Sequence, residues 1–189
     1  PFNHREDIAD VPEWVKDAVV YNIFPDSFAG AAGKISGDHI TKLFQNEHMD
    51  EPVCTSSNLG GTIRGIGENA GYLKELGINC IYINPIFAAG EYHKYDTLDY
   101  FHIDPCFGSN EDFKEMVKIM HQNGIRVIID GVFNHCGWKF FAFEDVVKNG
   151  EKSKYVDWFY KLTFPVKRPE TPEEIPGYEC FAYERLMPK

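Results

Sequence analysis

The segment from Asp130 to His135 reads "DGVFNH" and directly follows the apolar run "IRVII". It brings an acid, an amide and an imidazole (Asp130, Asn134 and His135) together where a predicted buried strand ends. Such residues could supply a catalytic acid or support a site whose reactive groups lie elsewhere. An Asp at a strand end could equally cap the following turn, and the His could be a satisfied core residue.

A second polar cluster, "EYHKYD", occupies residues 91–96 and follows the apolar run "INCIYINPIF". It contains His93, Tyr95 and Asp96. A tyrosine ring offers a flat face for stacking on a sugar and a hydroxyl group that can orient it. Without other signals, Tyr95 would be an ordinary, partly buried tyrosine.

The elements that must position these clusters alternate between strand and helix patterns. Strands are predicted in three apolar runs, namely residues 18–24, 78–87 and 125–133. Two amphipathic helices lie between them, at 62–77 with Gly77 as its C-cap and at 110–124 with Asn110 as its N-cap. Residues 26–60 and 87–110 are predicted to be long loops. Because the strands are apolar along their whole length, we expect a parallel sheet buried on both faces.

Two α/β architectures fit this order, an open doubly wound sheet and a (β/α)₈ barrel. In both, chemistry occurs at the carboxyl ends of the strands, where Asp26, "HKYD" and "DGVFNH" stand in this sequence. A dinucleotide site would favour the open sheet. The segment "GGTIRGIG" is its only support, but it does not follow a strand and lacks the G-x-G-x-x-G spacing. The sequence therefore favours the (β/α)₈ barrel over the open sheet.

Composition narrows the functional classes. The 189 residues carry a net charge of −10, which argues against nucleic acid or an anionic membrane as a partner. A hydrophobic fraction of 43% is enough for a packed core. The 15 Phe and 10 Tyr residues fit either core packing or a surface that stacks against sugars.

Cysteine usage and the absence of a membrane-length apolar stretch indicate the compartment in which the protein works. The cysteines are odd in number and form no C-x-x-C pair, which favours a reducing compartment over disulfides or zinc (Cys54, Cys80, Cys106, Cys136 and Cys180). There is no signal-like start and no run long enough to span a membrane. We therefore expect a cytoplasmic protein, although a chain that begins with Pro1 leaves open a removed leader or a preceding domain.

Five ordered blocks resemble the α-amylase family of glycoside hydrolases: "YNIFPDSF", "GINCIYINPIF", "HKYDTLDYFHIDPCFGS", "DGVFNH" and "LMPK". They are most similar to its neopullulanase, cyclomaltodextrinase and maltogenic amylase branch. The resemblance implies the N-terminal part of a (β/α)₈ barrel. It predicts a linker over residues 1–17, three β/α units over residues 18–135, and over residues 136–189 the excursion called domain B, which ends before strand four.

The resemblance also implies an activity, a retaining hydrolysis of α-1,4-glucosidic bonds in cyclodextrins, pullulan, maltooligosaccharides or starch. Retaining enzymes use a carboxylate nucleophile and a carboxylic acid about 5 Å apart. The family motifs for both are absent here, so this chain by itself is expected to be inactive. The alternative is a non-catalytic piece that binds α-glucan or is purely structural. Three barrel strands without their neighbours are also expected to self-associate through exposed edges.

Residue roles carry over from the matching motifs. The resemblance implies that Asp130 is a supporting residue, which holds an Arg that orients the nucleophile, rather than the catalytic acid. It implies that His135 donates a hydrogen bond to a hydroxyl of the sugar at the cleavage subsite. Tyr95 would form the aromatic platform under that sugar, and His93 would be a second contact beside it. Asp96 is expected to brace the loop.

This sequence differs most from the branch that it resembles in the residues of a calcium site. Asn134 matches an Asn that ties its loop to a structural calcium in many α-amylases, but in this branch we expect it to hydrogen-bond within the loop. The branch's own calcium site uses an acidic loop and a "GGD" block. This sequence has "AGAAGKISGD" and "GGT" instead, which leaves too few carboxylates for calcium. We therefore predict no metal and no other cofactor.

Overall fold

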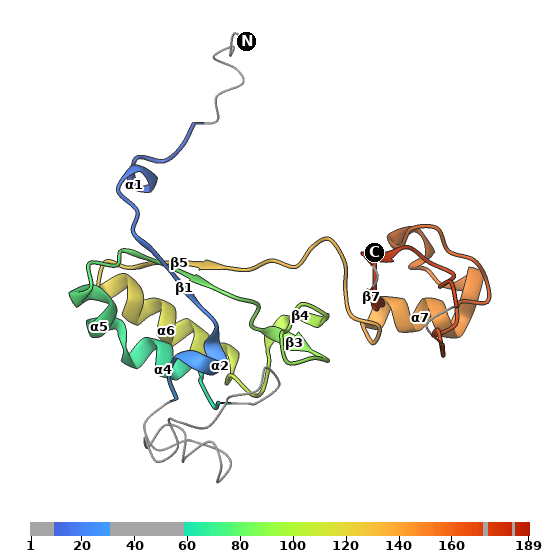
Figure 1. Cartoon of the computed structure of the whole chain (residues 1–189), viewed down its shortest axis with the longest axis horizontal. Coiled ribbons are helices and arrows are strands. Elements are labelled where there is room, and N and C mark those ends of the chain that lie inside the picture. The colour runs from blue at the N-terminus through green and yellow to red at the C-terminus, as the bar shows by residue number, and fades with distance from the viewer. Residues whose placement is uncertain (1–9, 31–58, 172–173, 183) are drawn as a thin grey trace.

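The computed structural model of the protein describes residues 10–30, 59–171, 174–182 and 184–189. Its centre is a parallel sheet in the order β1-β2-β5, which Figure 1 shows beside a layer of helices. The strands are β1 (Val20–Ile23), β2 (Cys80–Ile83) and β5 (Arg126–Ile129). The three strands expected from the sequence are thus present and parallel. Cys54 and most of the predicted loop 26–60 lie outside the described residues.

Helices pack against one face of this sheet and form the main core with it (Figure 1). They are α4 (Ile63–Glu68), α5 (Ala70–Glu75) and α6 (Asn110–Gln122); the four-residue helices α1 (Glu13–Lys16) and α2 (Pro25–Phe28) flank β1. The core unites apolar side chains of strands and helices, among them Ile23, Ile66, Leu73, Ile81, Ile83, Met116 and Met120.

The predicted single helix at 62–77 is wrong in one respect, because it breaks at Asn69. The Nδ2 of Asn69 donates to the carbonyl of Gly65 at 2.8 Å, a local hydrogen bond of the kind that competes with helix continuation. Gly65 itself is required, since a Cβ there would lie 2.1 Å from the carbonyl oxygen of Ala29. Gly77 ends the second helix with φ +79, as the sequence predicted.

The expected N-cap of α6 is also wrong by one residue. Ser109, not Asn110, caps the helix through a capping box, in which its Oγ accepts from Asp112 N at 3.1 Å and its N–H donates to Asp112 Oδ2 at 2.9 Å. Asn110 instead bridges to the preceding strand. Its Oδ1 accepts from Ile103 N at 2.9 Å, and its Nδ2 donates to the Phe101 carbonyl at 2.8 Å.

Burial on both faces holds only for the central strand. In the described part of the chain, β2 is largely buried, whereas β1 alternates between exposed and buried or half-buried positions and β5 is mostly exposed. Val20 is 52% exposed, and Ile128 and Ile129 are 38% and 37% exposed. The expectation fails for these two strands because the described helices cover one face of the sheet only (Figure 1).

The predicted loop 87–110 contains an antiparallel hairpin of β3 (Phe87–Ala89) and β4 (Thr97–Ile103), so it is not irregular throughout. The sequence pattern missed it because β3 is only three residues long and its register with β4 is irregular. The turn of this hairpin, residues 90–96, carries the "EYHKYD" cluster. We refer to it below as the site loop.

The residues that follow β5 form a second hydrophobic core (Figure 1). Their elements are α7 (Phe141–Asn149), the 3₁₀ turns η2 (Gly150–Lys152) and η3 (Val156–Trp158), and the hairpin of β6 (Cys180–Phe181) and β7 (Glu184–Pro188). The core includes Cys136, Phe143, Val146, Val166 and Tyr178. A hydrogen bond from Gly137 N to the Thr97 carbonyl at 2.8 Å connects this part to β4. Where the domain boundaries fall stays a prediction.

Candidate functional site

A line of hydrogen bonds crosses the carboxyl ends of the three parallel strands. Asn22 on β1 donates through Nδ2 to Oδ1 of Asn84, just after β2, at 3.0 Å. Asn84 in turn donates to the hydroxyl of Tyr95 at 3.3 Å, and that hydroxyl donates to Oδ2 of Asp130 at 3.2 Å. The platform tyrosine suggested by the resemblance is therefore fixed between residues that follow β2 and β5.

Electrostatics keep this tyrosine protonated. Burial and the adjacent Asp130 carboxylate raise the pKa of Tyr95, and the same two causes raise the pKa of Tyr82. The phenol therefore stays a hydrogen-bond donor at neutral pH. Asp130 acts here as an acceptor that orients a hydroxyl group. That geometry suits the supporting role expected for it, which stays a prediction.

His135 is held by protein groups at both ring nitrogens. Its Nε2 lies 3.0 Å from the carbonyl oxygen of Tyr95, and its Nδ1 lies 3.1 Å from Nδ2 of Asn134. We assign the proton to Nε2, because a carbonyl can only accept and the Asn134 amide can donate to Nδ1. The residue is only 9% exposed, and its ring stacks on Phe181 with centroids 4.6 Å apart.

Burial lowers the pKa of His135, so the imidazole is neutral at pH 7. In this arrangement the histidine ties the site loop to the chain after β5. The predicted hydrogen bond from His135 to a sugar hydroxyl would require Nε2 to leave the Tyr95 carbonyl. It stays a prediction.

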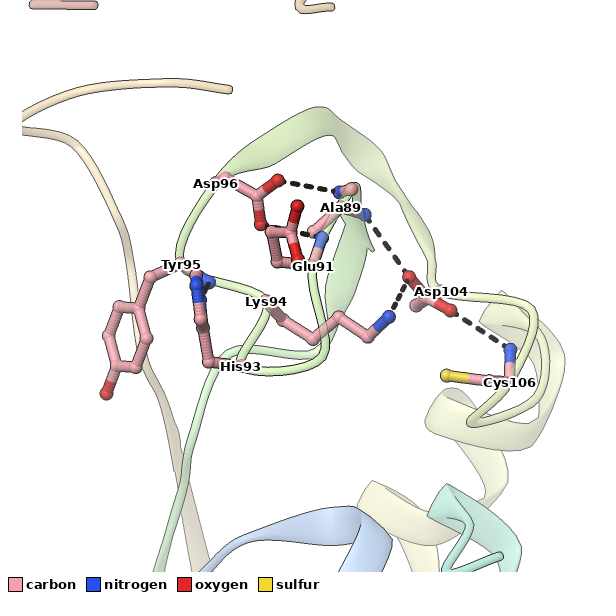
Figure 2. A network of polar contacts seen from close by, with 9 residues as sticks. Ala89, Glu91, His93, Lys94, Tyr95, Asp96, Asp104 and Cys106 are labelled. Carbon is pink, nitrogen blue, oxygen red and sulfur yellow. Dashed lines mark hydrogen bonds and ion pairs between the residues drawn. The ribbon is translucent and has the colours of Figure 1, made fainter. Parts of the chain in front are cut away.

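The other two predicted residues of the site loop have different environments. His93 accepts a hydrogen bond from Tyr95 N through Nδ1 at 3.0 Å. Asp96 is 7% exposed and accepts from Gly90 N through Oδ2 at 3.0 Å and from Glu91 N through Oδ1 at 3.1 Å. These bonds, drawn in Figure 2, are those expected of a residue that braces the loop.

Several polar residues around the site gave no usable sequence signal. Lys94 forms a 2.9 Å ion pair with Asp104, which follows β4 (Figure 2). Asp26 accepts from Leu59 N at 2.8 Å, from Gly60 N at 3.1 Å and from the Tyr92 hydroxyl at 2.8 Å. Asp26 was noted as polar at a strand end, but its partners could not be found by spacing because they are far away in the sequence.

Two cavities adjoin the site residues. One of about 420 Å³ lies between the site loop, Trp138 and β7, and is lined by Glu91, His93, Asp96, Trp138, Arg168 and Glu184 among others. The other, of about 260 Å³, is lined by Asn134 and His135 together with aromatic side chains that include Tyr100, Phe133 and Trp158. Aromatic walls with a few polar groups suit a sugar ring.

No group of three His, Cys, Asp or Glu side chains is placed to hold a metal ion within the described ranges. Thr62, which stands where the branch has an Asp, caps α4 by accepting from Gly65 N at 3.0 Å. Most of the loop that would supply other ligands lies outside the described residues, and the absence of a metal stays a prediction. None of the described helices is long and apolar enough to cross a membrane.

A parallel sheet whose polar residues gather at the carboxyl ends of its strands is typical of (β/α)₈ barrel enzymes. Similarity to known proteins supports this fold and this kind of site. Residues 22–184 match the family of the alpha amylase catalytic domain. This chain belongs to the alpha-amylase family.

Individual relatives support the same branch. A cyclomaltodextrinase of Geobacillus thermopakistaniensis is 47% identical over all 189 residues, and this chain covers 31% of it. A solved cyclomaltodextrinase structure matches the whole chain with 40% identity and a TM-score of 0.78, over 31% of its own length. A cyclic alpha-maltosyl-(1→6)-maltose hydrolase of Arthrobacter globiformis in complex with maltose matches 94% of this chain and 38% of its own, with 35% identity and a TM-score of 0.75. The chain thus spans about a third of these relatives.

Proposed function

We propose that this chain is part of a retaining glycoside hydrolase that cleaves α-1,4-glucosidic bonds in cyclodextrins, pullulan, maltooligosaccharides or starch. In the full-length protein, an acid would protonate the glycosidic oxygen while a carboxylate nucleophile forms a covalent glucosyl ester. Both carboxylates would come from segments outside this chain. The present residues would contribute the floor of the sugar subsite and contacts that orient the sugar.

The observation that carries this proposal is the placement of Tyr95. Its hydroxyl is fixed by Asn84 and Asp130 at the carboxyl end of the sheet, and its backbone carbonyl is bound by His135. A rigid aromatic ring with bound polar neighbours is preorganised to receive a sugar face, which limits the entropy lost on binding. The whole-chain similarity to a cyclomaltodextrinase supports the choice of α-glucan as ligand.

Further properties belong to the same proposal. We propose a cytoplasmic enzyme that needs no metal or other cofactor and has neither nucleic acid nor a membrane as a partner. The supporting observations are the acidic net charge of −10 and the scattered cysteines.

The test is turnover of β-cyclodextrin and pullulan by the full-length protein, with release of reducing ends as the readout. Tyr95→Ala should lower kcat/KM about tenfold to a hundredfold, the loss expected when an aromatic contact worth roughly 1.5–3 kcal/mol is removed. Tyr72→Ala is the matched control, because Tyr72 is 49% exposed on α5, and it should leave turnover unchanged.

The alternative is a non-catalytic module that binds α-glucan. Saturable binding of maltotriose to the full-length protein, without turnover of any of the four substrates, would favour it. The isolated 189-residue chain should show no turnover in either case. Turnover by the isolated chain would contradict the assignment of the reactive carboxylates to other segments.

A further inference from the structure

We propose that Lys94 and Asp104 are positioning residues, whose buried ion pair holds the site loop in the conformation that presents His93 and Tyr95. The effect on sugar affinity rests on the proposed function. The anchoring of the loop rests on its geometry alone, so the two can fail separately.

The backbone of Lys94 is the first reason. Its φ is +62, in the left-handed region that residues other than glycine seldom adopt. This conformation turns the N–H of Tyr95 back toward the preceding side chain, where Nδ1 of His93 accepts it at 3.0 Å. The backbone at residue 94 therefore determines how the two predicted sugar contacts lie relative to each other.

The side chain of Lys94 supplies the restraint that this backbone requires. Its Nζ lies 2.9 Å from Oδ2 of Asp104, and the two side chains are only 12% and 9% exposed. The same ammonium group lies 5.8 Å from the centre of the Phe107 ring, at the favourable face for a cation. A disfavoured backbone persists only where its surroundings determine it in this way.

Asp104 is a fixed partner, which makes the restraint effective. Its carboxylate also accepts from Ala89 N through Oδ2 at 3.2 Å and from Cys106 N through Oδ1 at 3.0 Å (Figure 2). Its own N–H donates to the Ile86 carbonyl at 2.8 Å. Asp104 thus connects β3, the turn after β4 and the site loop.

Both partners are charged across the neutral range. Burial alone would lower the pKa of Lys94, but hydrogen bonds and charge attraction, chiefly from Asp104, outweigh it and raise that pKa. Burial alone would raise the pKa of Asp104, yet hydrogen bonds from Cys106 and Lys94 outweigh it and lower the pKa. Desolvation of the thiol group, followed by the nearby Asp104, raises the pKa of Cys106 to about 12, so the thiol stays neutral although the residue as a whole is exposed.

The pair of Lys94 and Asp104 differs from the ion pairs at the surface in being buried. Lys114 and Glu111 on α6 are closer, at 2.6 Å, but are 70% and 79% exposed. Exposed pairs of this kind contribute little, whereas removal of one member of a buried pair leaves an uncompensated charge. Lys114→Met is therefore a matched control for Lys94→Met.

The experiment compares four variants of the full-length protein: Lys94→Met, Lys94→Arg, Lys94→Gly and Lys114→Met. One readout is amide hydrogen exchange in the site loop, at Gly90, Glu91 and Tyr95. The other is KM against kcat for β-cyclodextrin. Lys94→Met should speed exchange about tenfold to a hundredfold and raise KM about tenfold with a smaller change in kcat.

The remaining variants separate the ion pair from the backbone. Lys94→Arg keeps a cation and should recover at least half of the loss on a logarithmic scale. Lys94→Gly relieves the φ restriction without a cation, so it should resemble Lys94→Met. Lys114→Met should match the original protein in both readouts.

Two results with the folded single variants would overturn the inference. One is exchange and KM within twofold of the original protein in Lys94→Met, and the other is full recovery by Lys94→Gly. If the full-length protein hydrolyses no glucan, the proposed function fails, and the exchange readout still decides the anchoring. If Lys94→Met does not fold, the double variant Lys94→Met with Asp104→Asn should fold better than Lys94→Met alone, because it removes the unpaired carboxylate. A double variant that folds no better than Lys94→Met also contradicts the inference.

Discussion

The bracing of the site loop by Asp96 can be tested by replacing its carboxylate with an amide. In Asp96→Asn, a single side-chain oxygen remains to serve the N–H groups of Gly90 and Glu91, which now bind one carboxylate oxygen each. The new NH₂ group faces a donor, so one buried N–H loses its partner. Hydrogen bonds to a charged group contribute about 1.5–3 kcal/mol each, and a buried unsatisfied donor adds to the loss. The site loop should be destabilised by about 2–4 kcal/mol.

Amide exchange measures this loss where it occurs. A local opening that becomes easier by about 2–4 kcal/mol should accelerate exchange of the Gly90 and Glu91 amides by roughly 30-fold to 1,000-fold, since every 1.4 kcal/mol is a factor of ten. The amides of β2 should exchange as before, because the bonds of Asp96 do not reach that strand. A global measure such as the melting temperature is less direct, because it averages over the whole protein.

Asp99→Asn provides the control for this test. Asp99 lies on β4, which directly follows the site loop, and accepts from Phe101 N at 2.8 Å, but its side chain is 41% exposed, so water can replace the lost contact. The Phe101 amide should change less than about fivefold, which corresponds to less than 1 kcal/mol. If exchange at Gly90 and Glu91 in Asp96→Asn stays within threefold of the original protein, the reasoning from buried carboxylate hydrogen bonds is refuted.

Other properties of the fold can be tested in the same way. Burial lowers the pKa of His135, so the unfolded state binds its proton more readily, and stability should be complete above about pH 6.5 and fall as the pH drops toward the folded-state pKa. The melting temperature should thus decrease less between pH 7.5 and 5.5 in His135→Gln than in the original protein, and equal decreases would contradict this. Gly61→Ala would place a Cβ 1.9 Å from the Pro25 carbonyl oxygen and should cost about 3 kcal/mol or more in chemical denaturation, whereas Gly71→Ala, with open space around it in α5, should be neutral or stabilising; similar effects would refute the steric argument. The isolated chain should self-associate in light scattering through the outer edges of β1 and β5, which have no strand partner among the described residues, and a clean monomer at high concentration would count against it.

The main elements of the fold could be predicted from the sequence because each has a strong local signal. The three apolar runs became parallel strands, and Gly77 and Gly124 end their helices at positive φ. The local signals failed where a single side-chain bond or an irregular strand pairing decides the structure. Asn69 breaks a helix through its own side-chain bond, and the hairpin β3–β4 is too short and irregular to give a pattern.

The candidate site, like the fold, could be predicted only in part. The resemblance drew attention to His93, Tyr95 and His135, and the structure brings them together within hydrogen-bond distance of one another or of shared neighbours. Their anchors could not be predicted. Asn84 and Asp104 are ordinary polar residues in the sequence, and their role depends on the path of the chain between them and the site loop.

The site loop is held by one set of contacts within the loop and by two that reach other parts of the chain, and this links its shape to the C-terminal region. Asp96 holds the start of the loop, and the pair of Lys94 and Asp104 ties it to the end of β4. His135 holds the Tyr95 carbonyl from the segment after β5, and its ring is covered by Phe181 of β6. Because burial also keeps His135 neutral, loss of the Phe181 ring would both loosen the imidazole and ease its protonation. Phe181 therefore belongs with the residues that determine the orientation of Tyr95, although no motif in the sequence connects them.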